Sequence, residues 1–137
     1  MSGWRDELIE AIKSKNERDA EEEARRKQRL EAALEVADAA LEKAEEGLRF
    51  ADEQLRAKQQ PVKLHKKNGE VALEMHDQRL SVLLSRDDAV LRVSYNDGRP
   101  REFDFAKDRH LSPKDVEEYV GRRAVELARA AQKTNPW

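Results

Sequence analysis

The chain has 137 residues, 41% of them charged, with a formal net charge of -2. This near balance excludes a general electrostatic attraction to nucleic acid or anionic membranes, and the absence of cysteine excludes disulfide bonds and thiol catalysis. No apolar run reaches the roughly 18 to 20 residues that a membrane span needs. We therefore expect a cytoplasmic protein, and the Ala-, Glu- and Arg-rich composition suggests a bacterial one.

Residues 4–59 predict one long helix. No proline occurs before Pro61, and the segment holds a single glycine, Gly47. Residues 4–12 are amphipathic, and we expect their apolar face either to contact an oligomer partner or the body of the domain, or to dock on a partner protein. The candidate docking residues, which include the tryptophan that ends the chain, are Trp4, Leu8, Ile9, Ile12 and Trp137.

Residues 13–29 predict a solvated helical spacer. They hold almost no apolar side chain, but they pair Glu21 with Arg25, Glu22 with Arg26 and Glu23 with Lys27 at i,i+4 spacing. Each such pair stabilises an isolated helix by roughly 0.2–0.5 kcal/mol. A segment of this kind can stay helical without a partner.

Residues 30–57 carry a heptad seam in which leucine recurs every seventh residue and small residues lie beside it. Small residues let two backbones approach closely, which favours antiparallel pairing. Gly47, which costs about 1 kcal/mol relative to alanine in a helix, is interpreted as the point of closest approach. The expected interface consists of Leu30, Ala33, Leu34, Ala37, Ala40, Leu41, Ala44, Gly47, Leu48, Ala51 and Leu55.

Two partners for this seam stay open. The first is the same helix of a second chain, which would make the protein a homo-oligomer, with a dimer favoured. The second is the chain's own C-terminal helix, which could cover part of the seam. An acidic stripe beside the seam is expected to face solvent or a basic partner, and it consists of Glu31, Asp38, Glu45 and Asp52.

Residues 61–107 predict a five-stranded antiparallel β-meander, because turn signals recur at Asn68-Gly69, Asp77-Gln78 and Asp87-Asp88. The second turn would set Leu73 opposite Val82. A slip of one residue would scramble the apolar face. That face is expected to collect Val62, Leu64, Val71, Leu73, Met75, Leu80, Val82, Leu84, Leu91, Val93, Tyr95, Phe103 and Phe105.

The opposite face of the meander is polar. The first turn sets Lys63 opposite Glu74 and Lys67 opposite Glu70, and both pairs are complementary in charge, which supports the register. The basic residues that could form a track for nucleic acid are Lys58, Lys63, Lys66, Lys67, Arg79, Arg92, Arg99 and Arg101.

Ser112-Pro113 predicts the start of a helix over residues 113–132, because serine caps a helix, proline favours its first position, and Asp115 can complete a capping box. Its apolar stripe should cover the apolar sheet face. The expected fold class is therefore α+β: a long, coiled-coil-like N-terminal helix (residues 1–60), then a head of antiparallel sheet with a C-terminal helix packed on one sheet face (residues 61–137).

The sequence carries no catalytic motif, cofactor fingerprint or metal-ligand spacing, so we expect neither an enzyme nor a cofactor or metal. The leading hypothesis is a structural or adaptor protein that self-associates through its long helix and binds an unidentified partner protein. One alternative is a nucleic-acid-binding module on the basic side of the meander, although that face lacks aromatic residues for base stacking. The other is a regulatory or chaperone-like subunit completed by a partner helix. We expect no membrane as a partner.

Overall fold

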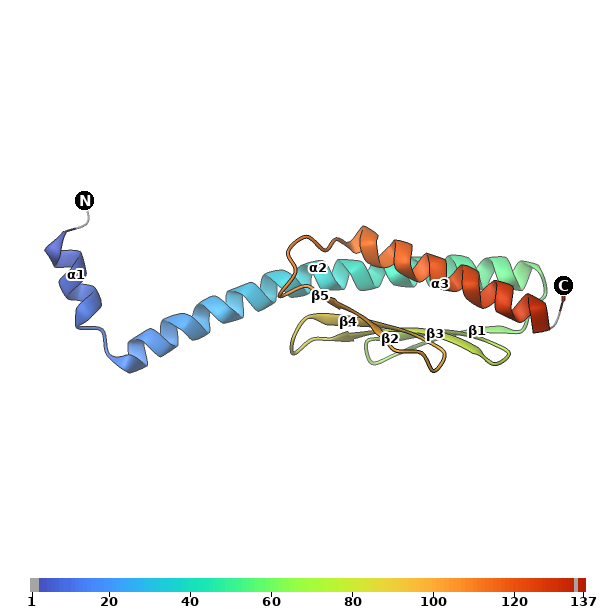
Figure 1. Ribbon diagram of the computed structural model, residues 1–137, viewed down its shortest axis with the longest axis horizontal. Helices are drawn as coiled ribbons and strands as arrows, with labels where there is room; N and C mark the ends of the chain where they lie inside the picture. The colour runs from blue at the N-terminus through green and yellow to red at the C-terminus, as the bar shows by residue number, and fades with distance from the viewer. Residues whose placement is uncertain (1–2, 135) are drawn as a thin grey trace.

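A computed structural model describes residues 3–134 and 136–137. Figure 1 shows an elongated molecule in which a layered head lies at one end of a long helix. The elements in chain order are α1 (Trp4–Ala11), α2 (Lys15–Ala57), β1 (Val62–Lys67), β2 (Glu70–Met75), β3 (Gln78–Ser85), β4 (Val90–Tyr95), β5 (Arg101–Asp104) and α3 (Pro113–Thr134). The strands form one sheet in the order β1-β2-β3-β4-β5, which confirms the predicted α+β class and the meander.

The prediction of one continuous helix over residues 4–59 is wrong, because α1 and α2 are separated at Ile12–Ser14. Ser14 has an extended backbone with ψ of 159°, and its side chain accepts a hydrogen bond of 3.1 Å from the amide of Glu17. This is a helix cap, and the Ser-x-x-Glu pattern that announces it is present in the sequence. A new helix therefore starts here in a new direction (Figure 1).

The strand register confirms most of the predicted pairing and corrects one turn. Leu64 lies opposite Leu73, as predicted. The turn between β2 and β3 is formed by His76 and Asp77, so Leu73 lies opposite Leu80 and not Val82. A shift of two residues leaves each side chain on its own face, so the predicted apolar face is unchanged.

The third connection restores the predicted register through a longer loop. Leu84 lies opposite Leu91, and Ser85 opposite Val90, which leaves residues 86–89 as the loop. At the start of α3, the Asp115 carboxylate accepts a hydrogen bond of 2.9 Å from the Ser112 amide, which confirms the predicted cap.

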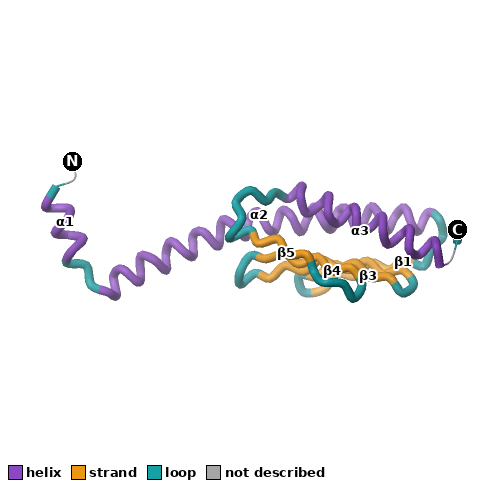
Figure 2. Tube along the Cα trace, in the orientation of Figure 1, coloured by secondary structure: helices purple, strands orange, loops and turns teal. Residues whose placement is uncertain are grey.

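The head has two layers, a sheet and a pair of helices that both cover its inner face (Figure 2). The C-terminal part of α2 and α3 lie side by side and run in the same direction (Figure 1), so the antiparallel pairing favoured by the small residues is wrong. The topology explains the direction. Because α2 leads into an antiparallel meander of five strands, an odd number, the chain leaves the sheet at the end where α2 entered the head. The returning helix must then run parallel to α2.

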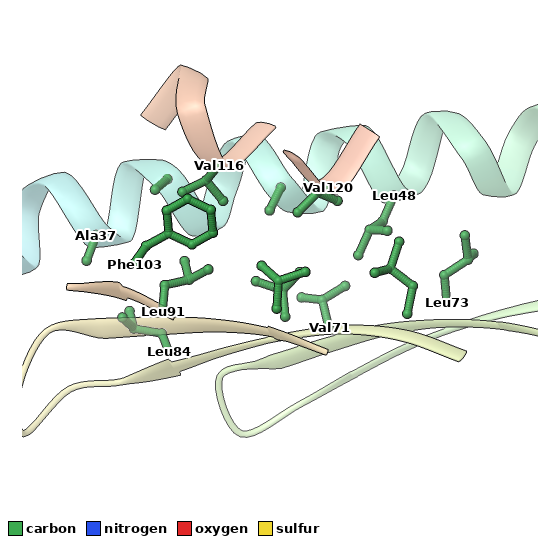
Figure 3. Close-up of a cluster of buried hydrophobic side chains, with 14 of the residues drawn as sticks. Ala37, Leu48, Val71, Leu73, Leu84, Leu91, Phe103, Val116 and Val120 are labelled. Carbon is green, nitrogen blue, oxygen red and sulfur yellow. The ribbon is translucent and has the colours of Figure 1, made fainter. Parts of the chain in front are cut away.

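The core lies between the two layers. Figure 3 shows Ala37 of α2 and Val116 of α3 on the side of Phe103 and Leu91 of the sheet, and Leu48 of α2 above Leu73. Three alanines on α2 are fully buried, so this helix approaches both of its neighbours closely. The buried residues of this helix are Ala33, Ala37, Ala40, Ala44, Leu48 and Leu55.

The acidic stripe of α2 faces basic residues of its own chain. Asp38 pairs with Arg86 at 2.6 Å, and Glu45 pairs with Lys66 at 3.1 Å. These ion pairs tie α2 to β1 and to the loop that follows β3. For Asp38 and Glu45 the basic partner that the stripe predicted therefore lies in the same chain, whereas Asp52 pairs with Arg56 of α2 itself at 2.9 Å.

Replacing Ala40 by leucine tests the close packing of α2. The side chain is fully buried, so Ala40→Leu overpacks the core, and we expect it to lower the free energy of unfolding by about 1–3 kcal/mol. Ala39→Leu is the matched control, because Ala39 is the exposed neighbour on the same helix and should change stability by less than about 0.5 kcal/mol. Urea denaturation of both variants measures the difference, and equal values would contradict the packing.

Candidate functional site

The heptad seam of α2 faces the interior of its own chain. Six of its eleven residues are buried, and the leucines Leu30, Leu34 and Leu41 with Ala51 are partly buried against the same core. The sheet and α3 cover this face, which matches the second of the two partners expected for it. The most deeply buried seam residues, such as Ala37, Ala40 and Ala44, therefore offer no free surface to a second chain. Any binding surface has to involve residues outside this buried part of the seam.

An apolar groove lies between α2 and α3. Its volume is about 620 Å³, and no strand contributes to its lining. α2 and α3 run side by side in the same direction (Figure 1). The lining residues extend along both helices, from Glu46 to Leu55 on α2 and from Glu117 to Ala128 on α3. Its lining residues are Glu46, Gly47, Phe50, Ala51, Gln54, Leu55, Lys58, Glu117, Gly121, Ala124, Val125, Ala128 and Trp137.

Three large apolar side chains of the groove are exposed to solvent. Phe50 of α2 is 65% exposed, Val125 of α3 is 48% exposed, and Trp137 is 41% exposed. Single exposed apolar residues are common on protein surfaces, but a group of them lining one hollow marks a binding surface. The structure thus brings the predicted docking residue Trp137 to this groove, and not to α1.

Two glycines form part of the groove lining, one on each helix. A Cβ atom built on Gly47 or on Gly121 meets no heavy atom within 4 Å. The interpretation of Gly47 as a point of close approach within the seam is therefore wrong for the single chain. Each glycine costs about 1 kcal/mol relative to alanine in a helix, so the chain carries two destabilising residues that face open space.

α1 is the second unpartnered apolar surface. None of its residues is buried, and the predicted docking residues Trp4, Leu8, Ile9 and Ile12 are each between 50% and 71% exposed. In the molecule α1 lies at the far end of α2 from the head (Figure 1). Three of these four residues lie on α1 and Ile12 caps its C-terminal end, and none of the four belongs to the core.

Ion pairs link α1 to α2 at the bend. The Lys13 ammonium lies 3.1 Å from the Glu10 carboxylate and 2.9 Å from that of Glu21. Hydrogen bonding to Glu21 raises the pKa of Lys13, and the same bond lowers the pKa of Glu21. Arg18 adds a hydrogen bond of 3.0 Å to the Glu10 carbonyl oxygen.

The outer face of the sheet is polar, and its charges are paired with one another. Arg79 donates to Glu70 at 2.6 Å and to Glu74 at 3.0 Å, and Arg92 donates to Glu102 at 3.2 Å. The predicted register between β1 and β2 is correct, but Glu70 and Glu74 pair with Arg79 of β3, and not with the lysines directly opposite them. Acidic side chains thus neutralise two of the arginines of the expected basic track.

The residues that the structure describes contain no candidate metal-binding cluster. The His65 ring lies 3.3 Å from the Glu74 carboxylate, yet no group of three His, Asp or Glu side chains in the described ranges could hold a metal ion. Across residues 3–134, no helix is both long enough and apolar enough to cross a membrane. The groove and α1 are therefore the surfaces with the strongest indication of function.

Sequence reasoning missed most of the groove lining, including Phe50, Gly121 and Val125. Phe50 lies outside the leucine seam, three residues after Gly47. A large aromatic residue off the apolar stripe of a helix, close to a glycine, is a signal that could have indicated a second face. Gly121 and Val125 are four residues apart and so share one face of α3, but no pattern in the sequence pairs that face with Phe50.

Replacing the two groove glycines tests whether the groove is open in the single chain. Because nothing lies near either Cβ position, Gly47→Ala and Gly121→Ala should each raise the free energy of unfolding by about 0.5–1 kcal/mol. Gly69→Ala is the control of opposite sign, because Gly69 has φ of +78° in a turn, where a side chain is strained. Thermal and urea denaturation at a protein concentration where the chain is monomeric measure all three, and destabilisation by the groove variants there would show that the groove is filled within the single chain.

Replacing Arg79 tests the ion-pair network of the outer sheet face. Its hydrogen bond is the largest cause that lowers the pKa of Glu74. A carboxyl whose pKa is lowered by folding stabilises the fold at neutral pH, and this contribution is lost as the pH falls through the lowered value. Arg79→Gln should therefore raise the pKa of Glu74 and make the acid dependence of stability shallower. A carboxyl NMR titration of Glu74 checks this, and an unchanged pKa would contradict it.

Comparisons with known proteins do not identify a family for this chain. No family model, no curated protein and no solved structure matches the chain. The surfaces of the molecule itself, namely the groove, α1 and the spacer between them, are therefore the grounds on which a function can be proposed.

Proposed function

We propose that this protein is a non-catalytic structural or adaptor protein whose head binds an amphipathic helix in the groove between α2 and α3. The observation that carries the proposal is the combination of exposed Phe50 and Val125 with two glycines that face open space. Grooves between helices bind amphipathic helices by accepting their apolar face. Glycines in the lining let the backbone of the incoming helix approach closely.

The shape of the molecule supports an adaptor role. α2 has 43 residues, and its exposed part before Leu30 separates α1 from the head (Figure 1). Ion pairs such as Arg25 with Glu21 at 3.7 Å stabilise this spacer in solvent. A rigid spacer with one docking surface at each end is suited to holding two partner proteins at a fixed distance from each other.

The structure supports the two alternative functions to different extents. A regulatory or chaperone-like subunit completed by a partner helix would use the same groove, so it differs only in what the bound helix belongs to. Nucleic-acid binding gains no supporting observation, since Arg79 and Arg92 are paired with acids on the outer sheet face. Self-association remains part of the proposal, but it moves from the buried seam to the exposed surfaces.

Site-specific photo-crosslinking in the organism that makes the protein tests this function. Phe50→p-benzoylphenylalanine places the reactive group in the groove, and we expect irradiation to attach a protein there. Leu83→p-benzoylphenylalanine is the matched control, because Leu83 is an exposed apolar residue on a strand and lies outside the groove. Equal products from both positions, or none from position 50, would contradict the proposal.

A further inference from the structure

We propose that the helix that binds in the groove is α1 of a second copy of this chain. This inference rests on the proposed function and names the partner of the same groove. It follows from two unpartnered apolar surfaces in one molecule, from the distance that separates them, and from their match in length and charge.

α1 has the pattern that a groove-binding helix needs. At 100° per residue, Trp4, Leu8 and Ile12 lie on one face, with Ile9 at its edge. The acids Asp6, Glu7 and Glu10 lie on the opposite face and would stay in solvent when the apolar face is bound. The apolar face is exposed along its whole length, so binding it would remove four large side chains from water.

The chain cannot place α1 in its own groove. From Lys15 to Gly47, α2 is one continuous helix, which separates its start from the groove by about 48 Å at 1.5 Å per residue. Only residues 12–14 connect α1 to α2, and three extended residues span about 10 Å at most. The α1 that reaches the groove must therefore come from another molecule.

The groove and α1 match in length. α1 has 8 residues, or about 12 Å. The α2 residues that line the groove run from Glu46 to Leu55, with Lys58 just beyond the helix, or about 14–18 Å by the same rise per residue. The whole of α1 can therefore lie within the groove.

The charges at one end of the groove set an orientation. Glu46 and Glu117 are the first lining residues of α2 and of α3, and they lie at the same end because the two helices run in the same direction. α1 carries its single arginine, Arg5, in its first turn, on the same side as its apolar face, between the directions of Ile12 and Ile9. Arg5 meets the acidic end when α1 runs parallel to α2 and α3 of the other copy.

A contact between α1 of one copy and the groove of another joins two different surfaces. Such a contact closes when two copies exchange their α1 helices, and otherwise it continues as an open chain. Because each molecule carries its α1 far from its groove (Figure 1), two copies can exchange both helices without unfolding either head. We therefore expect a reciprocal dimer.

Complementation between two defective variants tests the inference on the full chain. Ile12→Asp damages α1 and leaves the groove intact, whereas Phe50→Asp damages the groove and leaves α1 intact. Both side chains are exposed, so both variants should fold, which circular dichroism checks. Sedimentation equilibrium over a concentration series should show an associated wild-type chain and at least a tenfold weaker association for each variant. Leu83→Asp, on the outer sheet face, is the matched control and should associate like the wild type.

Mixing the two variants gives the decisive measurement. An equimolar mixture contains one intact α1 and one intact groove in each mixed pair, so we expect association to return in the mixture, with one contact in place of two. Variants that weaken association without recovery on mixing would indicate α1–α1 or groove–groove contacts and would overturn the inference. A wild-type chain that stays monomeric would overturn it as well. A foreign protein crosslinked at position 50 would then still support the proposed function, which separates the two failures.

Discussion

The architecture depends on the close approach of α2 to two neighbours at once. Ala37, Ala40 and Ala44 are fully buried, and larger side chains at these positions would push the helix away from the sheet or from α3. Because alanine also has the highest helix propensity, the same residues favour the helix and permit its packing. The approach then places α3 beside α2, since the odd number of strands returns the chain to the end where α2 enters the head. The groove is a consequence, because two helices in contact below leave a hollow on the side away from the sheet.

The helix α2 therefore has two parts of different composition, one that forms the core of the head and one that forms a solvated spacer. Within the head, α2 is a core element with an apolar face, and Asp38 and Glu45 of its acidic stripe pair with Arg86 of the β3–β4 loop and Lys66 of β1. Before Leu30 it is a solvated rod, held by ion pairs between neighbouring turns. The bend at Ser14 then turns α1 away from the axis of the rod, and the ion pairs of Lys13 hold that bend. A straight helix would have continued the rod, whereas the bend presents α1 as a separate surface.

The sequence allowed the sheet to be predicted because its information is local. The Asn-Gly turn sets the first register, and the alternation of apolar residues identifies the inner face even where the turn at His76 was misplaced by a residue. The partner of the seam could not be predicted in this way. A heptad shows that one face of a helix is buried but does not show what buries it, and Ala40 would look the same against a second chain as against the sheet. The groove was missed for a related reason, since Phe50 and Val125 lie on helices separated by the whole sheet in sequence.

Open glycines and exposed aromatic residues are each unfavourable for a chain that acts alone. Gly47 and Gly121 reduce the stability of their helices. Phe50 exposes apolar surface to water, which a polar residue at the same position would avoid. Both features become favourable together when a helix lies in the groove, because the glycines admit its backbone and the aromatic ring packs against its side. The apolar face of α1 has the same character, being unfavourable in solvent and favourable once covered. The rod formed by α2 is too long for α1 to reach the groove of the same molecule. The two apolar surfaces can therefore cover each other only when a second molecule supplies one of them.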